Sequence, residues 1–294
     1  MKKIALLIVV LLSGVRPAAA QTIVQLEGTS KYQLTVGNLS MTVDAGAGAK
    51  ILSFTCDGKE VISQSTWPET FGSTFWTSPQ KEWNWPPVQE YDKKPYEVEQ
   101  AEGKLVVKSQ VSERLKYRIR KEFAADESGK SFVVTYSITN EGQEARKVAP
   151  WEITRVVNDG MIFFDAPADS IWPAGLMPFK DAHGAAWYHA DAAQQNRKVN
   201  ADGKGWLAYV NNGLLLVKQF QDLDLSQPAP EEAEIQVYVN RGKTYIELES
   251  QGAYTLLQPG ESLQWAVRWY LVATQLPAEP SEQLLQQVKQ VLSK

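Results

Sequence analysis

Cysteine and histidine are scarce in this sequence of 294 residues, which has Cys56, His183 and His189 and no others of either type. A single cysteine excludes a fold held together by internal disulfides. The histidines are six positions apart, and no cysteine or carboxylate cluster stands at zinc-ligand spacing, so we expect no metal site. Phosphate-binding glycine loops and the Gly-x-Ser-x-Gly motif are also missing, and we expect no cofactor.

The sequence also lacks an excess of basic residues. It has 30 Lys and Arg against 34 Asp and Glu, which gives a formal net charge of −4. A nucleic acid needs a basic surface to neutralise its phosphates, so the composition gives no electrostatic reason to expect such a partner. Hydrophobic residues make up 44% of the chain, which is enough to fill a large core and argues against a disordered protein.

Long hydrophobic runs are confined to the N-terminus. Lys2 and Lys3 precede an apolar run at 4–12 and three alanines that end at Ala20, a pattern typical of a secretory signal peptide cleaved after Ala20. The run is interrupted too early to span a bilayer, which takes about 20 apolar residues. We therefore predict a signal peptide at 1–20 and a secreted or periplasmic protein with no membrane span in its mature chain.

Alternation of apolar and polar residues dominates the rest of the chain and predicts strands. Leu115, Tyr117, Ile119 and Phe123, for example, are separated by charged residues that would point to the opposite side. Strands are predicted at 32–36, 39–44, 49–55, 104–112, 115–123, 132–138, 147–157, 206–210, 213–220, 234–240, 243–250 and 262–273. Short strands separated by turn residues predict an all-β fold, a large sandwich of antiparallel sheets.

Three segments depart from this alternation. Near the C-terminus, Ser281 can cap a short helix whose apolar residues form one stripe. The segments 67–95 and 165–204 fit neither strand nor helix, and long irregular segments of this kind are usually functional or mobile loops. No low-complexity linker and no fixed-period repeat divides the chain, so we predict a single domain at 21–294.

One predicted strand carries two carboxylates. Alternation places Glu247, Glu249 and Gln251 on one face, with Ile246 and Leu248 on the other. Carboxylates two residues apart on a strand are separated by about 6.5–7 Å, so they could share a polar cleft. A solvated outer face over a buried one is the alternative, and the pattern leaves both open.

Tryptophan is frequent, with 10 residues. Trp76, Trp83 and Trp85 lie in the first irregular segment, where they could form a platform for sugar rings, because the C–H face of a pyranose stacks on an aromatic plane. Core packing is the alternative for each of them. Trp265 and Trp269 belong to an alternating strand and are predicted to lie in the core.

Several short motifs, taken in order, resemble those of aldose 1-epimerases and other galactose mutarotase-like proteins. They are a glycine-rich entry and strand at 46–54, an Asp-Gly-x-Glu-Val turn at 57–61, Phe-Gly at 71–72, Leu-Glu-Ser-Gln at 248–251 and Leu-x-Pro-Gly-Glu at 257–261. The resemblance spans the mature chain. It implies a large twisted β-sandwich whose concave face binds a carbohydrate.

The resemblance also implies roles for particular residues. Glu249 takes the place of the family's general base, which accepts the proton of the anomeric hydroxyl. The strand that carries a catalytic histidine in the family corresponds in position to the stretch 137–155, which offers Glu152 and Arg155 and no histidine. Glu152 is therefore a second catalytic candidate, paired with Glu249. The candidate sugar contacts are Arg155, Trp76, Trp83, Trp85, Trp151, Glu247, Gln251 and His189.

Three functions fit these features. The first is an epimerase-like or other glycan-processing enzyme that uses Glu249, and two carboxylates would also suit glycoside cleavage. The second is a non-catalytic carbohydrate-binding protein that uses the tryptophans and Arg155. The third is a structural or interaction domain of an export assembly. The expected partner in the first two is a mono- or oligosaccharide.

Overall fold

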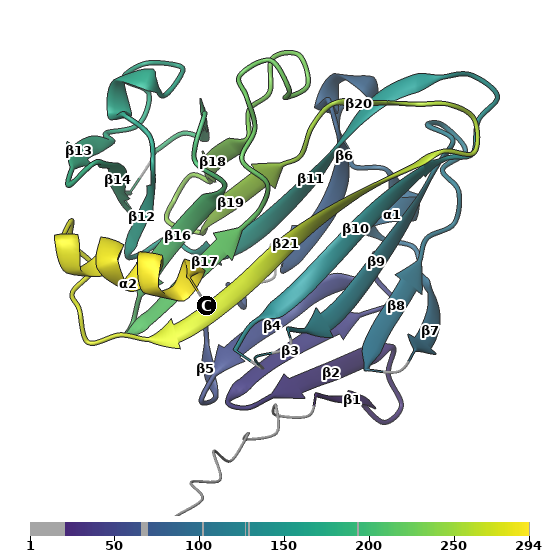
Figure 1. The fold of residues 1–294 in the computed structure, drawn as a ribbon, viewed down its shortest axis with the longest axis horizontal. Coiled ribbons are helices and arrows are strands. Elements are labelled where there is room, and N and C mark those ends of the chain that lie inside the picture. Colours follow the sequence, from purple (N-terminus) through teal and green to yellow (C-terminus); the bar gives the residue numbers. More distant parts are fainter. Residues whose placement is uncertain are drawn as a thin grey trace, which may run out of the picture.

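The computed structural model describes residues 21–65, 70–101, 103–126, 128, 130–192 and 194–293. The predicted signal peptide lies outside the described residues, so its export role stays a prediction. The strands of the described chain form two twisted antiparallel sheets that pack face to face (Figure 1). No helix among the described residues is long and apolar enough to cross a membrane.

The first sheet holds the N-terminal strands and the strands that carry the predicted carboxylates. In spatial order its strands are β1 (Thr22–Gln25), β2 (Lys31–Val36), β3 (Leu39–Asp44), β4 (Lys50–Cys56), β6 (Ser73–Ser78), β11 (Arg146–Val157), β19 (Tyr245–Gln251), β18 (Ile235–Val239) and β15 (Arg197–Ala201). The short strands β5 (Lys59–Glu60) and β20 (Thr255–Leu257) pair with β4 and β11.

The second sheet is built mainly from the middle of the chain and from its last strand. In spatial order its strands are β13 (Lys180–Ala182), β14 (Ala185–His189), β12 (Met161–Phe164), β16 (Trp206–Asn211), β17 (Leu214–Gln219), β21 (Ser262–Ala273), β10 (Phe132–Asn140), β9 (Tyr117–Ala125), β8 (Lys104–Lys108) and β7 (Glu97–Ala101). The helical elements are the short α1 (Gln89–Asp92), the 3-10 turns η1 (Gln80–Glu82) and η2 (Ala168–Ser170), and α2 (Glu282–Leu292).

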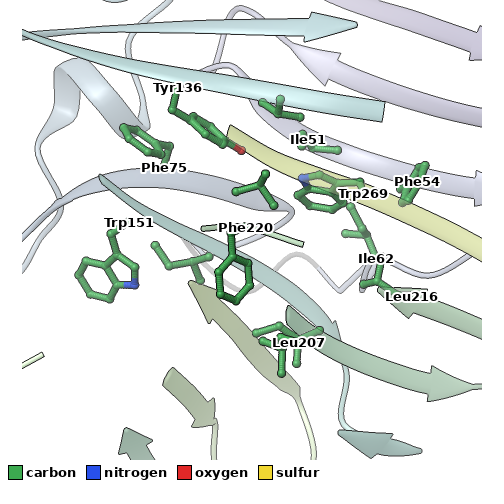
Figure 2. Close-up of a cluster of buried hydrophobic side chains, with 14 of the residues drawn as sticks. Ile51, Phe54, Ile62, Phe75, Tyr136, Trp151, Leu207, Leu216, Phe220 and Trp269 are labelled. Atoms are coloured by element: carbon green, nitrogen blue, oxygen red, sulfur yellow. The ribbon is translucent and has the colours of Figure 1, made fainter. Parts of the chain in front are cut away.

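The main core lies between the sheets. Phe75 of the first sheet stacks on Tyr136 of the second, with ring centroids 4.3 Å apart, and Trp269 packs edge-on against Phe54 (Figure 2). Trp265 also lies in this core, so the prediction for both tryptophans of the last strand is confirmed. The apolar stripe of α2 covers the outer face of the second sheet instead, around β12, β16 and β17.

The strand predictions hold where side chains alternate. The segments 39–44 and 262–273 match β3 and β21, and the C-terminal helix begins after Ser281, whose Oγ accepts a hydrogen bond from the Leu284 N–H. The two segments expected to be irregular are partly wrong, because β6, β13, β14 and β15 lie inside them. All six residues of β6 are buried, so no polar alternation marked this strand.

A buried ion pair links the sheets. Glu152 on β11 faces the interior and binds the Nζ of Lys218, which comes from β17 of the second sheet. The second oxygen of Glu152 accepts hydrogen bonds from Ser73 Oγ at 2.6 Å and Thr154 Oγ1 at 2.5 Å. Since both charged side chains are fully buried, each needs its partner in order to remain in the core.

Replacement of Glu152 by alanine should therefore destabilise the fold. The change leaves the Lys218 ammonium buried without a counter-charge, which costs about 3–5 kcal/mol of unfolding free energy. Urea denaturation checks this value, with Glu141→Ala as control. Glu141 forms an exposed ion pair with Arg118, and its loss should cost less than about 1 kcal/mol. Equal small losses in both variants would contradict the structural role of Glu152.

Candidate functional site

The outward face of the first sheet carries the candidate site. Strand pairing places Trp151 opposite Gln251 and Arg155 opposite Glu247, so these β11 and β19 side chains project to the same side. Trp151 also lies opposite Trp76 of β6. Because successive residues of a strand alternate, this side is the one that faces away from the second sheet.

A cavity of about 640 Å³ opens on this face. It lies over β6, β11, β19 and β18, and it combines tryptophan and tyrosine rings with carboxylate, amide and basic groups. Its lining residues are Thr70, Trp76, Gln80, Trp85, Trp151, Asn196, Lys198, Tyr238, Asn240, Arg241, Tyr245, Glu247 and Glu249. Aromatic walls with a few convergent polar groups are typical of small-molecule sites.

Glu249 is the most unusual group in the cavity. Its side chain is only 1% exposed, and its Oε2 accepts a hydrogen bond from Trp151 Nε1 at 2.8 Å. Its Oε1 is buried without a hydrogen-bond partner among the described residues. Burial raises the pKa of Glu249 to about 7, and the negative charge of Glu247 acts in the same direction. The carboxyl group can therefore exchange a proton near neutral pH.

Lys198 forms an ion pair with Glu249. Its Nζ lies 3.0 Å from Glu249 Oε2 and 4.4 Å from the centroid of the Trp151 ring. An ammonium at this distance favours the ionised carboxylate and so opposes the effect of burial on the pKa. Lys198 comes from β15, which pairs with β18, and its position on this face follows from its place opposite Tyr238.

Tryptophans build one wall of the cavity. Trp76 makes edge contacts with Trp83, Trp85 and Trp151 at centroid distances of 5.4, 6.2 and 5.3 Å. Trp83 is 2% exposed and donates its indole N–H to the Thr77 carbonyl oxygen, so it supports the wall from behind. Trp85 is 56% exposed and presents its ring to the solvent beside the cavity.

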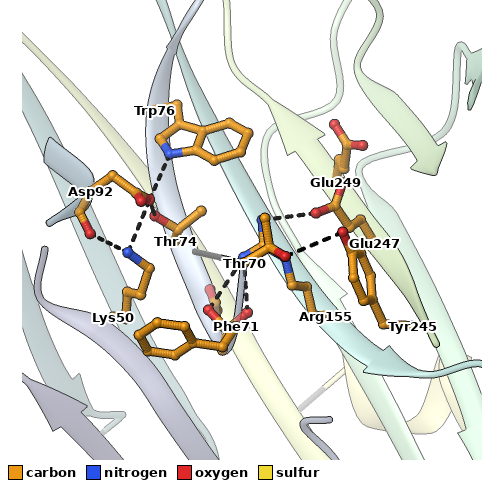
Figure 3. A network of polar contacts seen from close by, with 12 residues as sticks. Lys50, Thr70, Phe71, Thr74, Trp76, Asp92, Arg155, Tyr245, Glu247 and Glu249 are labelled. Carbon is orange, nitrogen blue, oxygen red and sulfur yellow. Dashed lines mark hydrogen bonds and ion pairs between the residues drawn. The ribbon is translucent and has the colours of Figure 1, made fainter. Parts of the chain in front are cut away.

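Asp92 anchors this wall through the side chains of Thr74 and Trp76 on β6. It accepts hydrogen bonds from Trp76 Nε1 at 2.9 Å and Thr74 Oγ1 at 2.7 Å, and it pairs with Lys50 at 3.0 Å (Figure 3). Burial opposes ionisation of Asp92, but Lys50 and these donors outweigh it and lower the pKa. Gly48 has a φ of +65°, and a Cβ there would lie 2.4 Å from the Asp92 carbonyl oxygen. The glycine-rich entry thus lets α1 pack against β4.

Arg155 and Glu247 form a second ion pair on the same face. Arg155 Nη2 lies 2.8 Å from Glu247 Oε1, and Nη1 donates to the Phe71 carbonyl oxygen at 3.3 Å (Figure 3). The guanidinium lies 5.8 Å from the ring centroids of both Trp76 and Tyr245. Arg155 is thereby fixed beneath the cavity, where it holds Glu247 in place.

The chain resembles known proteins in its structure and not in its sequence. No family model matches the chain, and no curated protein matches its sequence. Solved structures do match: a candidate aldose 1-epimerase from Escherichia coli K12 has a TM-score of 0.61 at 14% identity, over 84% of this chain and 100% of that one. A galactose mutarotase-like protein from Lactobacillus casei has a TM-score of 0.57 at 12% identity, over 86% and 100%. A galactose 1-epimerase from Lactobacillus acidophilus NCFM has a TM-score of 0.53 at 10% identity, over 87% and 100%.

The chain has the galactose mutarotase-like fold. The expected fold, a large antiparallel sandwich with a short C-terminal helix, is thus confirmed. At these low identities the likeness concerns the fold alone. The function of the cavity depends on the residues that line it.

The galactose mutarotase-like sandwich brings most of the predicted site residues together. Trp76, Trp85, Trp151, Glu247 and Glu249 line the cavity. The face of β19 that was expected to be either a cleft or a solvated surface is buried along its whole length. The alternative of a solvated outer face is therefore wrong for this strand.

Five predicted residues do not line the cavity, and one of them, Arg155, lies beneath it. Glu152 is on the opposite face of β11 from Arg155, so the expected pairing of Glu152 with Glu249 in one cleft is corrected. Gln251 is buried and donates to Glu232 Oε2 at 3.1 Å. Trp83 lies behind Trp76, as described above. His189 is on β14 of the second sheet, and neither histidine of the sequence is among the lining residues.

Sequence reasoning missed several lining residues. Lys198, Asn196, Tyr238, Asn240 and Arg241 come from β15, β18 and the adjoining loops. A signal for β15 does exist in the sequence, because Lys198 is followed by the buried Val199 in an alternating run. This short run lies inside the long segment 165–204, which is predicted to be irregular.

Replacement of Lys198 by methionine should raise the pKa of Glu249 above about 7. The ammonium group favours the carboxylate, and its removal leaves burial and Glu247 unopposed. A carbon-13 NMR titration of the glutamate carboxyl groups measures the midpoint. Lys104→Met is the control, because Lys104 pairs with Glu122 on the second sheet and should leave Glu249 unchanged. A Glu249 midpoint that stays or falls in Lys198→Met would contradict this assignment.

Proposed function

We propose that the chain binds carbohydrate in the cavity on the outer face of the first sheet and that Glu249 accepts a proton there. One observation carries the proposal: a buried carboxyl group with a raised pKa and an unpartnered Oε1 lies in a cavity walled by tryptophans. The structural neighbours named for aldose or galactose epimerisation support a sugar as the ligand class.

The chemistry of the cavity suits a sugar ring. Trp85 offers an exposed aromatic plane for the C–H face of a pyranose, while Asn196, Asn240 and Arg241 offer hydrogen-bonding groups for hydroxyls. A hydroxyl placed against Glu249 Oε1 would give this atom the partner it lacks. A carboxyl group with a pKa near 7 can take up that hydroxyl proton near neutral pH, which is the first step of ring opening.

Lys198 favours a second candidate function. Its ion pair with Glu249 holds the carboxylate oxygen Oε2, and neither histidine lines the cavity to act as a general acid. A cavity arranged in this way would also suit a carbohydrate-binding protein that does no chemistry. The two candidates share the ligand class and differ only in turnover.

Replacement of Glu249 by glutamine separates the two candidates. If Glu249 accepts a proton, turnover should fall by about a hundredfold to ten-thousandfold, because glutamine has the same shape but no proton affinity in this range. NMR of sugar anomer exchange and of glycan cleavage, over a panel of aldoses and glycans, measures the rate. The wild-type rate should also fall as the pH drops through about 7, since the protonated acid accepts no proton.

Glu279→Gln is the control for this experiment, because Glu279 is exposed in the loop before α2. Its rate and melting temperature should equal those of the wild type. Sugar binding without turnover in the wild type would refute proton transfer and favour the non-catalytic candidate. If no sugar binds to the wild type, both candidates fail.

We also propose that the protein is exported after removal of residues 1–20, on the basis of the charged, apolar and small-residue order of that segment. Expression of the full chain in a Gram-negative host should give a periplasmic product whose intact mass corresponds to 21–294. Mutation of Ala20 to a bulky residue such as tyrosine should block or displace the cut. A cytoplasmic product of full mass would contradict export.

A further inference from the structure

Trp172 extends the first sheet beyond its edge strand β15. Its backbone N–H donates to the Asn200 carbonyl oxygen at 3.0 Å, and the Asn200 N–H donates back to the Trp172 carbonyl oxygen at 2.7 Å. This antiparallel bridge fixes Trp172 directly opposite Asn200. Their side chains therefore project to the same face of the sheet.

That face is the one that carries the cavity. Val199 and Ala201 of β15 and Ile171 beside Trp172 are buried in the core between the sheets. By alternation, Asn200 and Trp172 point the other way, to the side of Lys198 and the cavity. Lys198 is the diagonal neighbour of Trp172 across the bridge, at a Cα separation of about 7–8 Å.

Trp172 has the properties of an open aromatic platform. Its side chain is 37% exposed, and in the described part of the chain only Trp85 among the tryptophans is more exposed. No ring contact of Trp172 is found with another described aromatic residue. Asn200 beside it is half-buried, and its Oδ1 is buried without a described partner, which leaves an acceptor for a hydroxyl donor.

The two exposed tryptophans lie on opposite sides of Glu249. Trp85 follows β6 on one side, and Trp172 lies beyond β15 on the other. Across the sheet, Trp172, Asn200, Gln236 and Glu249 form one row of directly paired residues. Three strand spacings separate Trp172 from Glu249, about 14 Å. This exceeds the width of one sugar ring, so a ring bound against Glu249 leaves Trp172 uncovered.

We propose that the ligand is an oligosaccharide, with one ring in the cavity beside Glu249 and Trp85 and a further ring stacked on Trp172. The inference rests on the proposed function, because it extends the same carbohydrate site. It assigns the substrate class as a glycan chain of several rings rather than a free monosaccharide. Lys198 and Asn200 would contact the chain between the two rings.

Calorimetric titration of the intact protein against chains of increasing length tests this assignment. The ligands are glucose, galactose and mannose together with gluco-, galacto- and manno-oligosaccharides. Affinity should rise with length until a ring reaches Trp172. Trp172→Ala should then lower the affinity for long chains by about fivefold to tenfold, the factor for loss of one aromatic contact. The affinity for single sugars should equal that of the wild type.

Two further variants keep the outcomes distinct. Trp85→Ala should lower the affinity for single sugars and for chains of every length, because the Trp85 ring lines the cavity. Leu176→Ala, which truncates an exposed apolar residue in the same loop as Trp172, should change nothing. If long chains bind equally to Trp172→Ala and the wild type, the inference falls while the proposed function stands. If no sugar binds at all, both fall.

Discussion

Strand β11 couples the stability of the sandwich to the geometry of the cleft. Its inward side chain Glu152 ties the two sheets together through Lys218, and its outward neighbours Trp151 and Arg155 hold Glu249 and Glu247 in the cavity. Because strand side chains alternate, a shift of β11 by one residue would move its inward side chains to the cavity face and its outward side chains into the core. The register that buries the ion pair is therefore also the register that positions the site.

The properties of the cavity follow from the burial of charge. A solvated Glu249 would be fully ionised near neutral pH, whereas burial among tryptophan rings brings its pKa to about 7. Trp151 and Lys198 bind Oε2 of Glu249 and hold the side chain in place, while Oε1 has no hydrogen-bond partner among the described residues. Asp92 also supports the cavity, since it accepts a hydrogen bond from Trp76 and so fixes the wall against which a sugar would stack.

Local pattern predicted the alternating strands and the face of β19, but not what long-range pairing brings together. Glu152 and Arg155 are three residues apart on one strand, and an odd spacing places side chains on opposite faces. Since Arg155 pairs with Glu247 on the face of Glu249, alternation alone predicts that Glu152 points away from Glu249. The uniformly buried β6 shows no alternation, and Lys198 reaches Glu249 only because β15 pairs with β18. Strand order of this kind depends on contacts distant in sequence, which composition and periodicity do not encode.

The central claim is that a sugar occupies the cavity beside Glu249, and NMR of the indole N–H groups tests it most directly. Trp151 donates its indole N–H to Glu249 within the cavity, while the indole of Trp187 donates to the Ala182 carbonyl oxygen on the second sheet. Titration with a bound glycan should shift the Trp151 and Trp85 resonances and leave that of Trp187 unchanged. Shifts confined to tryptophans outside the cavity would contradict the account.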